Sequence, residues 1–356
     1  MRVERLKQIL DEFPRVRALV IGDFCLDRWC VYDPGLAVPS RETGIPRTAV
    51  VSYEVTPGAG GTVTNNLVAL GAGRVDIIAV AGDDANGWEL ERALRCRGVE
   101  TRHLIRDAAR QTFTYTKLLN RATGQEDLPR LDFVNTGPPG CAAELAMLEA
   151  LETAVPDADV VVVADQSEIA AGAAVTGAVR EALISTAARF PERTFIADSR
   201  AQVERFRGLI VKPNEDEAVE AAMRVWNAEC GVRSEQDSAL RTPRSVLPVE
   251  EAGAILRRHL GGKLPLYITR GPEGALLFEG DEPLLVPARR NDDPVDICGA
   301  GDAFEAGLAL ALAATRRLDG APDYFAAAEL GHLAAAVTIT KRGTGTASAA
   351  ELLALL

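Results

Sequence analysis

The segment Val160–Ala164 is an unbroken run of apolar residues. Successive side chains of an extended chain point to opposite faces, so this run predicts a strand covered on both faces, as in the centre of a parallel sheet. Similar runs at 16–21, 75–80 and 266–269 alternate with segments of helical character. The alternation predicts an α/β fold, a mainly parallel twisted sheet with helices on both faces.

Other stretches interrupt this alternation with clusters of β-forming residues, at 48–55, 112–119 and 128–134. We expect inserted antiparallel strands around 28–58 and 110–135 that form a small β-sheet lid. Residues 231–248 are polar and rich in Arg, Ser and Pro, which predicts a loop. Helices are expected at 62–70, 86–97, 172–190, 214–227, 301–315 and 322–341. With these insertions we predict a single domain spanning residues 1–356.

The charge balance restricts the partners of the chain. The formal net charge of -12 disfavours nucleic acid and anionic membranes, so an anionic substrate needs a local basic pocket. The first residues are charged and contain no apolar core of a signal peptide, and no run reaches the roughly 18 apolar residues of a membrane span. We therefore expect a cytoplasmic protein that binds small molecules.

The segment Asp296–Phe304 carries the clearest chemistry in the sequence. A Gly-Ala-Gly turn, residues 299–301, leads into a helix rich in Ala and Leu. The amides of Gly299, Ala300 and Gly301 would face outward at the helix N-terminus, where the helix dipole favours an anion such as a phosphate. Asp302 would lie beside that anion and could accept the proton of an attacking hydroxyl.

This segment resembles the late signature of the PfkB/ribokinase family of sugar kinases, Asp-x-x-Gly-Ala-Gly-Asp-x-Phe. Four further motifs of that family are similar and occur in the same order, at 22–27, 60–65, 213–217 and 269–271. The resemblance runs from about residue 16 to the C-terminus. It implies a ribokinase-like fold and an ATP-dependent carbohydrate kinase, a phosphotransferase with an alcohol group as acceptor.

The resemblance also implies roles for individual residues. Asp302 would be the general base, and the 299–301 amides would hold the transferred phosphoryl group. The substrate would be bound by Asp23, Asp27, Gly60, Gly61 and Asn65. The nucleotide side would include Thr269, Gly271, Asn214, Glu217 and His332, the last beside adenine. Glu217 and Asn214 would hold Mg²⁺ through water, and Asp296 with carbonyls of 341–345 would hold a monovalent cation such as K⁺.

Some of these residues have equally simple structural explanations. Asn214 suits a helix N-cap with Glu217 as its capping-box partner, a role compatible with metal binding. Asp23 and Asp27 would also suit the capping of a turn. His332 would equally suit a packing role on the last long helix.

Within the family, the chain is most similar to the heptose-phosphate kinase branch. The similarity lies in residues 39–46, 130–133 and 198–200, and it implies that Arg41, Arg130 and Arg200 contact a sugar phosphate. After Asp165 that branch has an aromatic residue and Lys-Gly, whereas this chain has Gln166-Ser167. The sequence thus predicts a kinase of a sugar or sugar phosphate, such as a heptose 7-phosphate.

Three alternatives stay open at this point. The acceptor could be another small alcohol, a nucleoside or an unphosphorylated sugar. The chain could also be a non-catalytic sugar or nucleotide sensor on the same fold, although the intact Asp302 and Glu217 argue against it. A dinucleotide-binding dehydrogenase lacks support because Gly-x-Gly-x-x-Gly does not follow the first predicted strand. An apolar outer face on the lid would favour a homodimer.

Overall fold

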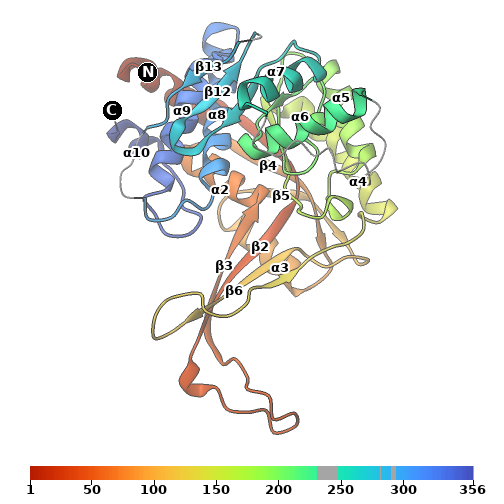
Figure 1. Ribbon diagram of the computed structural model, residues 1–356, viewed down its shortest axis with the longest axis vertical. Coiled ribbons are helices and arrows are strands. Elements are labelled where there is room, and N and C mark those ends of the chain that lie inside the picture. The colour runs from red at the N-terminus through yellow and green to blue at the C-terminus, as the bar shows by residue number, and fades with distance from the viewer. Residues whose placement is uncertain (231–246, 281, 290–293, 356) are drawn as a thin grey trace.

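A large sheet with helices on both faces and a smaller sheet projecting from it make up the structure (Figure 1). The computed structural model describes residues 1–230, 247–280, 282–289 and 294–355. The strand order of the large sheet is β13-β12-β11-β10-β9-β8-β1-β4-β5. In that order, the strands span Leu284–Val286, Ala275–Phe278, Leu266–Thr269, Ile210–Val211, Thr194–Ser199, Val160–Asp165, Arg17–Gly22, Arg74–Gly82 and Glu100–Asp107. Neighbours from β11 to β5 are parallel, while β12 and β13 are antiparallel additions.

Strand β8 lies at the centre of this sheet and is buried along its whole length. Val160, Val162 and Ala164 face one hydrophobic core, and Val161 and Val163 face the other. Each side chain of this strand is therefore shielded from water, on one face of the sheet or the other. The apolar run that predicted this strand is thus explained by burial on both faces.

Helices divide between the two faces of the sheet (Figure 1). The first core is covered by α1 (Val3–Glu12), α2 (Gly60–Leu70), α8 (Ala300–Asp319), α9 (Tyr324–Thr338) and α10 (Ala349–Ala354). The second core is covered by α4 (Cys141–Ala154), α5 (Gly177–Arg189), α6 (Glu215–Glu229) and α7 (Val249–His259). Helix α8 is buried from Ala303 to Thr315, as expected for its Ala- and Leu-rich sequence.

The smaller sheet has the order β3-β2-β6-β7, with strands Val50–Ala59, Phe24–Tyr32, Thr114–Asn120 and Leu131–Phe133. Helix α3 (Ala85–Arg95) packs against it. Strand β2 continues almost directly from β1, and the chain changes sheets at Gly22, whose φ is 140°. A Cβ there would lie 2.1 Å from the carbonyl oxygen of Ala164, so only glycine fits. The predicted α/β fold with a smaller added sheet is confirmed.

Several details differ from the sequence-based expectations. The inserted strands were expected to be antiparallel, but β2 and β6 pair in parallel. Strand β2 begins at Phe24, before the insertion expected around 28–58. The helix expected at 172–190 begins at Gly177, where Thr176 caps it, because the Ala174 amide donates to Asp23 instead. Most of the predicted polar loop, residues 231–246, lies outside the described residues.

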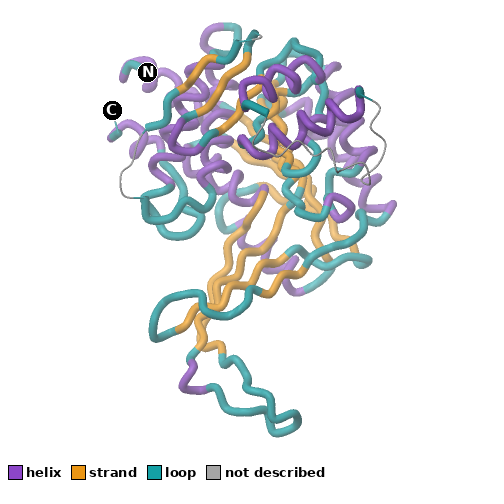
Figure 2. The backbone as a smooth tube through the Cα atoms, viewed as in Figure 1, coloured by secondary structure: helices purple, strands orange, loops and turns teal. Residues whose placement is uncertain are grey.

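Beyond β2 and β3, an arm of irregular backbone extends away from the large sheet (Figure 2). It contains the short 3₁₀ helix Pro34–Leu36 and a single bridge between Pro39 and Pro46. Among the described residues, no helix has the length and apolar character needed to cross a membrane.

Candidate active site

The N-terminus of α8 has unpaired backbone donors. Gly299 is the N-cap, with φ 78°, and Gly301 is exposed. Within the described residues, the amides of Gly299, Gly301 and Asp302 have no hydrogen-bond acceptor, whereas Ala300 donates to the carbonyl of Ile297 at 3.2 Å. The expected anion-binding tip is therefore present, with the Asp302 amide in place of that of Ala300.

Asp302 lies in the first turn of α8 and is half-buried. Burial, followed by the nearby Asp198 carboxylate, raises the pKa of Asp302 to about 7, and Lys212 and Arg200 oppose this rise. A carboxylate with a pKa near neutrality is well matched to accepting a proton under physiological conditions. The structure thus gives the predicted general base a suitable environment.

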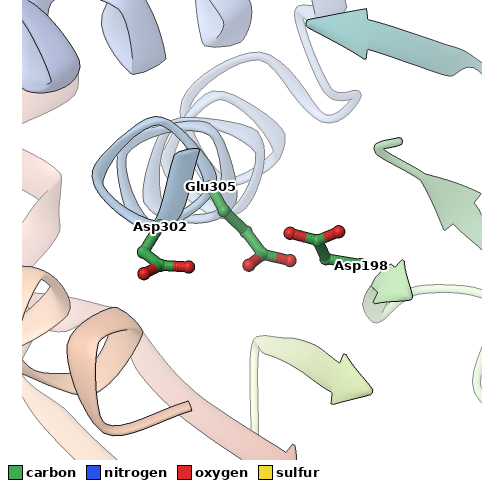
Figure 3. A group of neighbouring side chains, drawn as sticks. All are labelled: Asp198, Asp302 and Glu305. Carbon is green, nitrogen blue, oxygen red and sulfur yellow. The ribbon is translucent and has the colours of Figure 1, made fainter. Parts of the chain in front are cut away.

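Three carboxylates converge beneath the helix tip (Figure 3). Asp198, Asp302 and Glu305 each place one oxygen within 4.8 Å of the other two. Asp198 comes from the end of β9, and its Oδ2 accepts from the buried ammonium of Lys212 at 2.9 Å. The cluster is thus an acidic region partly neutralised by one buried lysine.

Asp27 of β2 lies on the side of the site that the small sheet forms. Burial raises the pKa of Asp27, while Lys117 and Arg130 are close enough to oppose that rise. A Cβ on Gly58 of the neighbouring strand would lie 2.3 Å from Asp27 Oδ2, so a side chain there would displace the Asp27 carboxylate. Asp27 also acts electrostatically on Asp302, which indicates that the small sheet faces the tip of α8.

Cations cluster around Asp27 and Asp302. Lys117 stands over the ring of Trp29 at 4.3 Å, and Arg130 stands over the ring of Tyr115 at 4.9 Å. Arg130 also forms a two-pronged ion pair with Asp132, and its side chain is 39% exposed. Arg200 donates to the Gln166 side chain at 3.0 Å. Arg200 also pairs with Glu168 at 3.5 Å, so carboxylates already partner two of these three cations.

Asp23, Gly60 and Gly61 are buried where the two sheets and α2 meet. The Asp23 carboxylate is 3% exposed and accepts backbone hydrogen bonds from Gln166, Ser167 and Ala174 at 2.7–3.0 Å. Both glycines are buried, and a Cβ on either would collide with Phe24 or Pro57. These contacts give the three residues a structural role, and their predicted contact with a substrate stays a prediction.

Asn65 differs from these neighbours. Its side-chain amide donates to the carbonyl of Pro57 at 3.3 Å, but its buried Oδ1 has no partner among the described residues. A buried acceptor without a donor is unfavourable, so this atom is suited to a hydroxyl donor from a ligand. The predicted role of Asn65 stays a prediction with this support.

The nucleotide-side motifs meet at one edge of the large sheet. Thr269 at the end of β11 forms a bridge with Asn214, and Gly271 follows in an exposed turn. Asn214 and Glu217 form a capping box, each side chain accepting from the other residue's amide at 2.8 Å. The other carboxylate oxygen of Glu217 has no hydrogen-bond partner in the described part of the chain. Burial, followed by the Asp198 carboxylate, raises the pKa of Glu217 to about 6.

Asp296 and His332 hold their surroundings together. Asp296 accepts from the amides of Cys298 at 2.9 Å and Gly343 at 3.0 Å, which joins the α8 loop to the 341–345 turn. His332 is 7% exposed and packs against Phe304 with 4.8 Å between ring centroids. Burial lowers the pKa of His332 to about 4, so the imidazole is neutral. This geometry favours the packing role for His332.

Arg41 lies apart from the other predicted residues. It is exposed on the arm that extends away from α8 (Figure 1). Within one chain the arm therefore holds Arg41 away from Asp302, and its expected contact with a sugar phosphate stays a prediction.

A model of the pfkB family carbohydrate kinases matches residues 24–351 of this chain. The chain belongs to the pfkB family of carbohydrate kinases. The predicted family and the predicted activity class, an ATP-dependent carbohydrate kinase, are confirmed.

Among pfkB relatives, the chain is 33% identical over 338 residues to the bifunctional protein HldE of Caulobacter vibrioides, covering 94% of this chain and 62% of that protein. It is 30% identical over 340 residues to HldE of Azorhizobium caulinodans, covering 95% and 64%. The chain thus spans less than two thirds of the length of these relatives.

Solved structures of sugar kinases share the fold. Ribokinase from Giardia lamblia has a TM-score of 0.68 at 15% identity, covering 96% of this chain and all of that one. Phosphofructokinase-2 from Escherichia coli in complex with potassium has a TM-score of 0.66 at 18% identity, covering 96% and 98%. At these identities the likeness concerns the fold alone.

Sequence reasoning missed four residues of this pfkB site: Gly58, Lys117, Lys212 and Glu305. Lys212 directly precedes the predicted Pro213–Glu217 motif, and Glu305 directly follows the motif ending at Phe304. A charged residue inside an otherwise apolar helix, as Glu305 is, could have been detected as unusual. Lys117 and Gly58 carried no local signal, because their importance depends on strand pairing.

Proposed function

We propose that this chain transfers the γ-phosphoryl group of ATP to a hydroxyl of a sugar that already carries a phosphate, as in a heptose phosphate kinase. The observation that carries the proposal is the position of Asp302, beside unpaired amides at the α8 tip and facing Asp27 of the small sheet. One side of this arrangement suits a phosphoryl group and the other suits an alcohol.

The chemistry would be an in-line displacement. Asp302 accepts the proton of the acceptor hydroxyl while the hydroxyl oxygen of the sugar bonds to the γ-phosphorus of ATP. The bond between that phosphorus and the β,γ-bridging oxygen breaks, which releases ADP. The amides of Gly299, Gly301 and Asp302 stabilise the negative charge on the migrating group. Asp27 and the Asn65 Oδ1 accept hydrogen bonds from sugar hydroxyls.

The basic residues around Asp27 favour a phosphorylated substrate. Lys117, Arg130 and Arg200 gather near the acceptor side, although the chain carries a net charge of -12. Such a local concentration of cations on an acidic protein suits an anionic ligand. An unphosphorylated sugar or a nucleoside offers these side chains only neutral acceptors, which bind cations less strongly than a phosphate does.

ATP would lie over the turn at Thr269 and Gly271, next to the α8 tip. Mg²⁺ fits the free oxygen of Glu217 and the exposed Asn214 through water, and when bound it neutralises phosphate charge. A monovalent cation such as K⁺ fits beside Asp296, where two loops meet. In this proposal His332 packs beneath this region and does not contact the nucleotide.

A homodimer through the small sheet is part of the proposal. Val50, Val51 and Tyr53 on β3 and Leu131 and Phe133 on β7 are exposed apolar residues of that sheet. Covering this surface with a second copy would remove it from water. The small sheet would then act as a lid that limits the access of water to the site.

Substrate screening tests the proposal. ADP release is measured with heptose 7-phosphate, the same sugar without phosphate, ribose and a nucleoside. We expect the phosphorylated sugar to have a kcat/KM larger by roughly 100-fold, the effect of one or two charge-assisted contacts. A preference for the nucleoside or the unphosphorylated sugar would contradict the proposal, and binding without turnover would favour a sensor.

Substitutions of the basic residues give the matched test. Lys117→Gln and Arg130→Gln should raise KM for the phosphorylated sugar while leaving that for the unphosphorylated sugar nearly unchanged. Arg189→Gln is the control, because Arg189 is exposed on α5 and pairs with Glu152. An equal effect on both sugars would show that these cations do not read the phosphate.

A further inference from the structure

Glu305 is a buried carboxyl group one helical turn beyond Asp302 on α8. Its side chain is 0% exposed, and neither oxygen has a hydrogen-bond partner among the described residues. An ionised carboxylate in such a place is costly unless it is paired. Glu305 therefore needs either a proton or a cation.

The charged groups that face Glu305 come from several elements. Asp198 lies at the end of β9, and Lys212 directly follows β10. Glu217 lies on α6, and Asp302 lies on α8, the same helix as Glu305. Arg200 and Asp27 act on Asp302 from the acceptor side. The buried ammonium of Lys212 is already engaged by Asp198 at 2.9 Å. An ionised Glu305 would thus add uncompensated negative charge to the cluster.

We infer that Glu305 is a neutral carboxylic acid that donates a hydrogen bond to the carboxylate of Asp302 and thereby orients the general base. This inference rests on the function proposed for Asp302. Figure 3 shows the Glu305 carboxyl group between those of Asp302 and Asp198, with oxygens of all three within 4.8 Å. A rotation of the Glu305 carboxyl group can close the remaining distance to Asp302. Glu305 is then a positioning residue, because it acts on the substrate only through Asp302.

The hydrogen bond would have two effects. It would fix one oxygen of Asp302, so that the other points toward the acceptor hydroxyl. It would also favour the ionised form of Asp302, since a donor to a carboxylate lowers its pKa. Without this donor, a buried carboxylate beside Asp198 would hold its proton at a higher pH. The burial of Glu305 and the carboxylate of Asp198 raise the pKa of Glu305 itself well above its usual value.

The pH dependence of kcat/KM shows whether Glu305 is a neutral hydrogen-bond donor, an ionised carboxylate or only a space-filling side chain. Glu305→Gln keeps a donor and is neutral, so the acidic limb of the profile should stay within about 0.3 unit of wild type. Glu305→Met removes the donor, so the limb should move about one unit to higher pH. Leu312→Met, another fully buried position on α8, is the control for altered packing.

Other outcomes of this experiment would overturn the inference. If Glu305 is ionised, both variants remove a negative charge and move the limb to lower pH. If the cluster holds a divalent cation, both variants lose activity together with the binding of Mn²⁺ measured by electron paramagnetic resonance. If Glu305 only fills space, neither variant moves the limb.

A second measurement needs no kinase activity, so it distinguishes failure of this inference from failure of the proposed function. The free energy of unfolding of wild type and Glu305→Gln is compared from pH 5 to pH 8. A carboxyl group whose pKa is raised in the folded state loses stabilisation as pH rises above its unfolded value, 4.5. Wild type should therefore become progressively less stable relative to Glu305→Gln across this range. A constant difference would show that Glu305 does not keep its proton on folding.

Discussion

The Lys212 ammonium lies 2.9 Å from the Asp198 carboxylate, and both side chains are almost fully buried below the tip of α8. Burial alone would lower the pKa of Lys212, yet the pKa is raised, and the Asp198 carboxylate is the largest cause that opposes burial. This ion pair therefore compensates part of the acidic cluster that surrounds the proposed general base.

Lys212→Met should remove this compensation. We expect a loss of roughly 3–5 kcal/mol in the free energy of unfolding, because Asp198 would be left buried without a partner. Urea denaturation measures the change, with Lys263→Met as the control at an exposed lysine. A loss below about 1 kcal/mol would show that the pair contributes no more than a surface ion pair.

The pH dependence of wild-type activity should reflect the environment of Asp302. The base must be deprotonated to act, so kcat/KM should rise with pH through a midpoint near the pKa of about 7, rather than near the ordinary value of 3.8. Glu217 titrates nearby, at about 6, so the profile of Glu217→Gln separates the two contributions. A midpoint near 4 in both proteins would contradict the environment assigned to Asp302.

Asp23 and Asp27 should differ in their response to substitution. Asp23→Asn should lower the free energy of unfolding by roughly 2–4 kcal/mol. In wild type, backbone N–H groups donate to both oxygens of the Asp23 carboxylate, whereas the NH₂ of asparagine is a donor and cannot accept them. Asp27→Asn should instead mainly raise KM for the sugar. Thermal unfolding and steady-state kinetics on both variants give the comparison. The reverse pattern would restore Asp23 as the substrate ligand.

Ala59 adopts a backbone conformation that suits glycine. Its φ is 53° and its ψ is -123°, just before α2 begins. Ala59→Gly should therefore stabilise the protein by about 1 kcal/mol, because relief of the backbone strain outweighs the greater conformational entropy that glycine loses on folding. Ala69→Gly, within α2, should destabilise it by a similar amount. Urea denaturation of both variants checks the opposite signs, and destabilisation by Ala59→Gly would contradict the strain.

The sequence was sufficient for features that depend on local pattern. The bounds of β11 agree with the strand predicted at 266–269, and the Gly-Ala-Gly-Asp turn does begin a long buried helix. Both features follow from residues adjacent along the chain: a short apolar run in the strand, and small residues followed by Ala and Leu in the helix.

Features that depend on distant parts of the chain could not be predicted in this way. The partners of Asp23 lie more than 140 positions away, so its carboxylate looked free for a ligand. Lys212 and Glu305 contribute to the site because the fold places them beside Asp198. The separate sequence motifs do not indicate that these residues are neighbours. Charge compensation in a buried cluster is a property of the folded arrangement.

The most direct test of the account is the turnover of Asp302→Asn on its sugar substrate. Asparagine keeps the shape of the side chain but cannot accept the hydroxyl proton, so kcat should fall by roughly 100- to 10,000-fold with an unchanged fold by circular dichroism. Near-normal sugar-dependent ADP release by this variant would contradict the assignment of Asp302 as the general base.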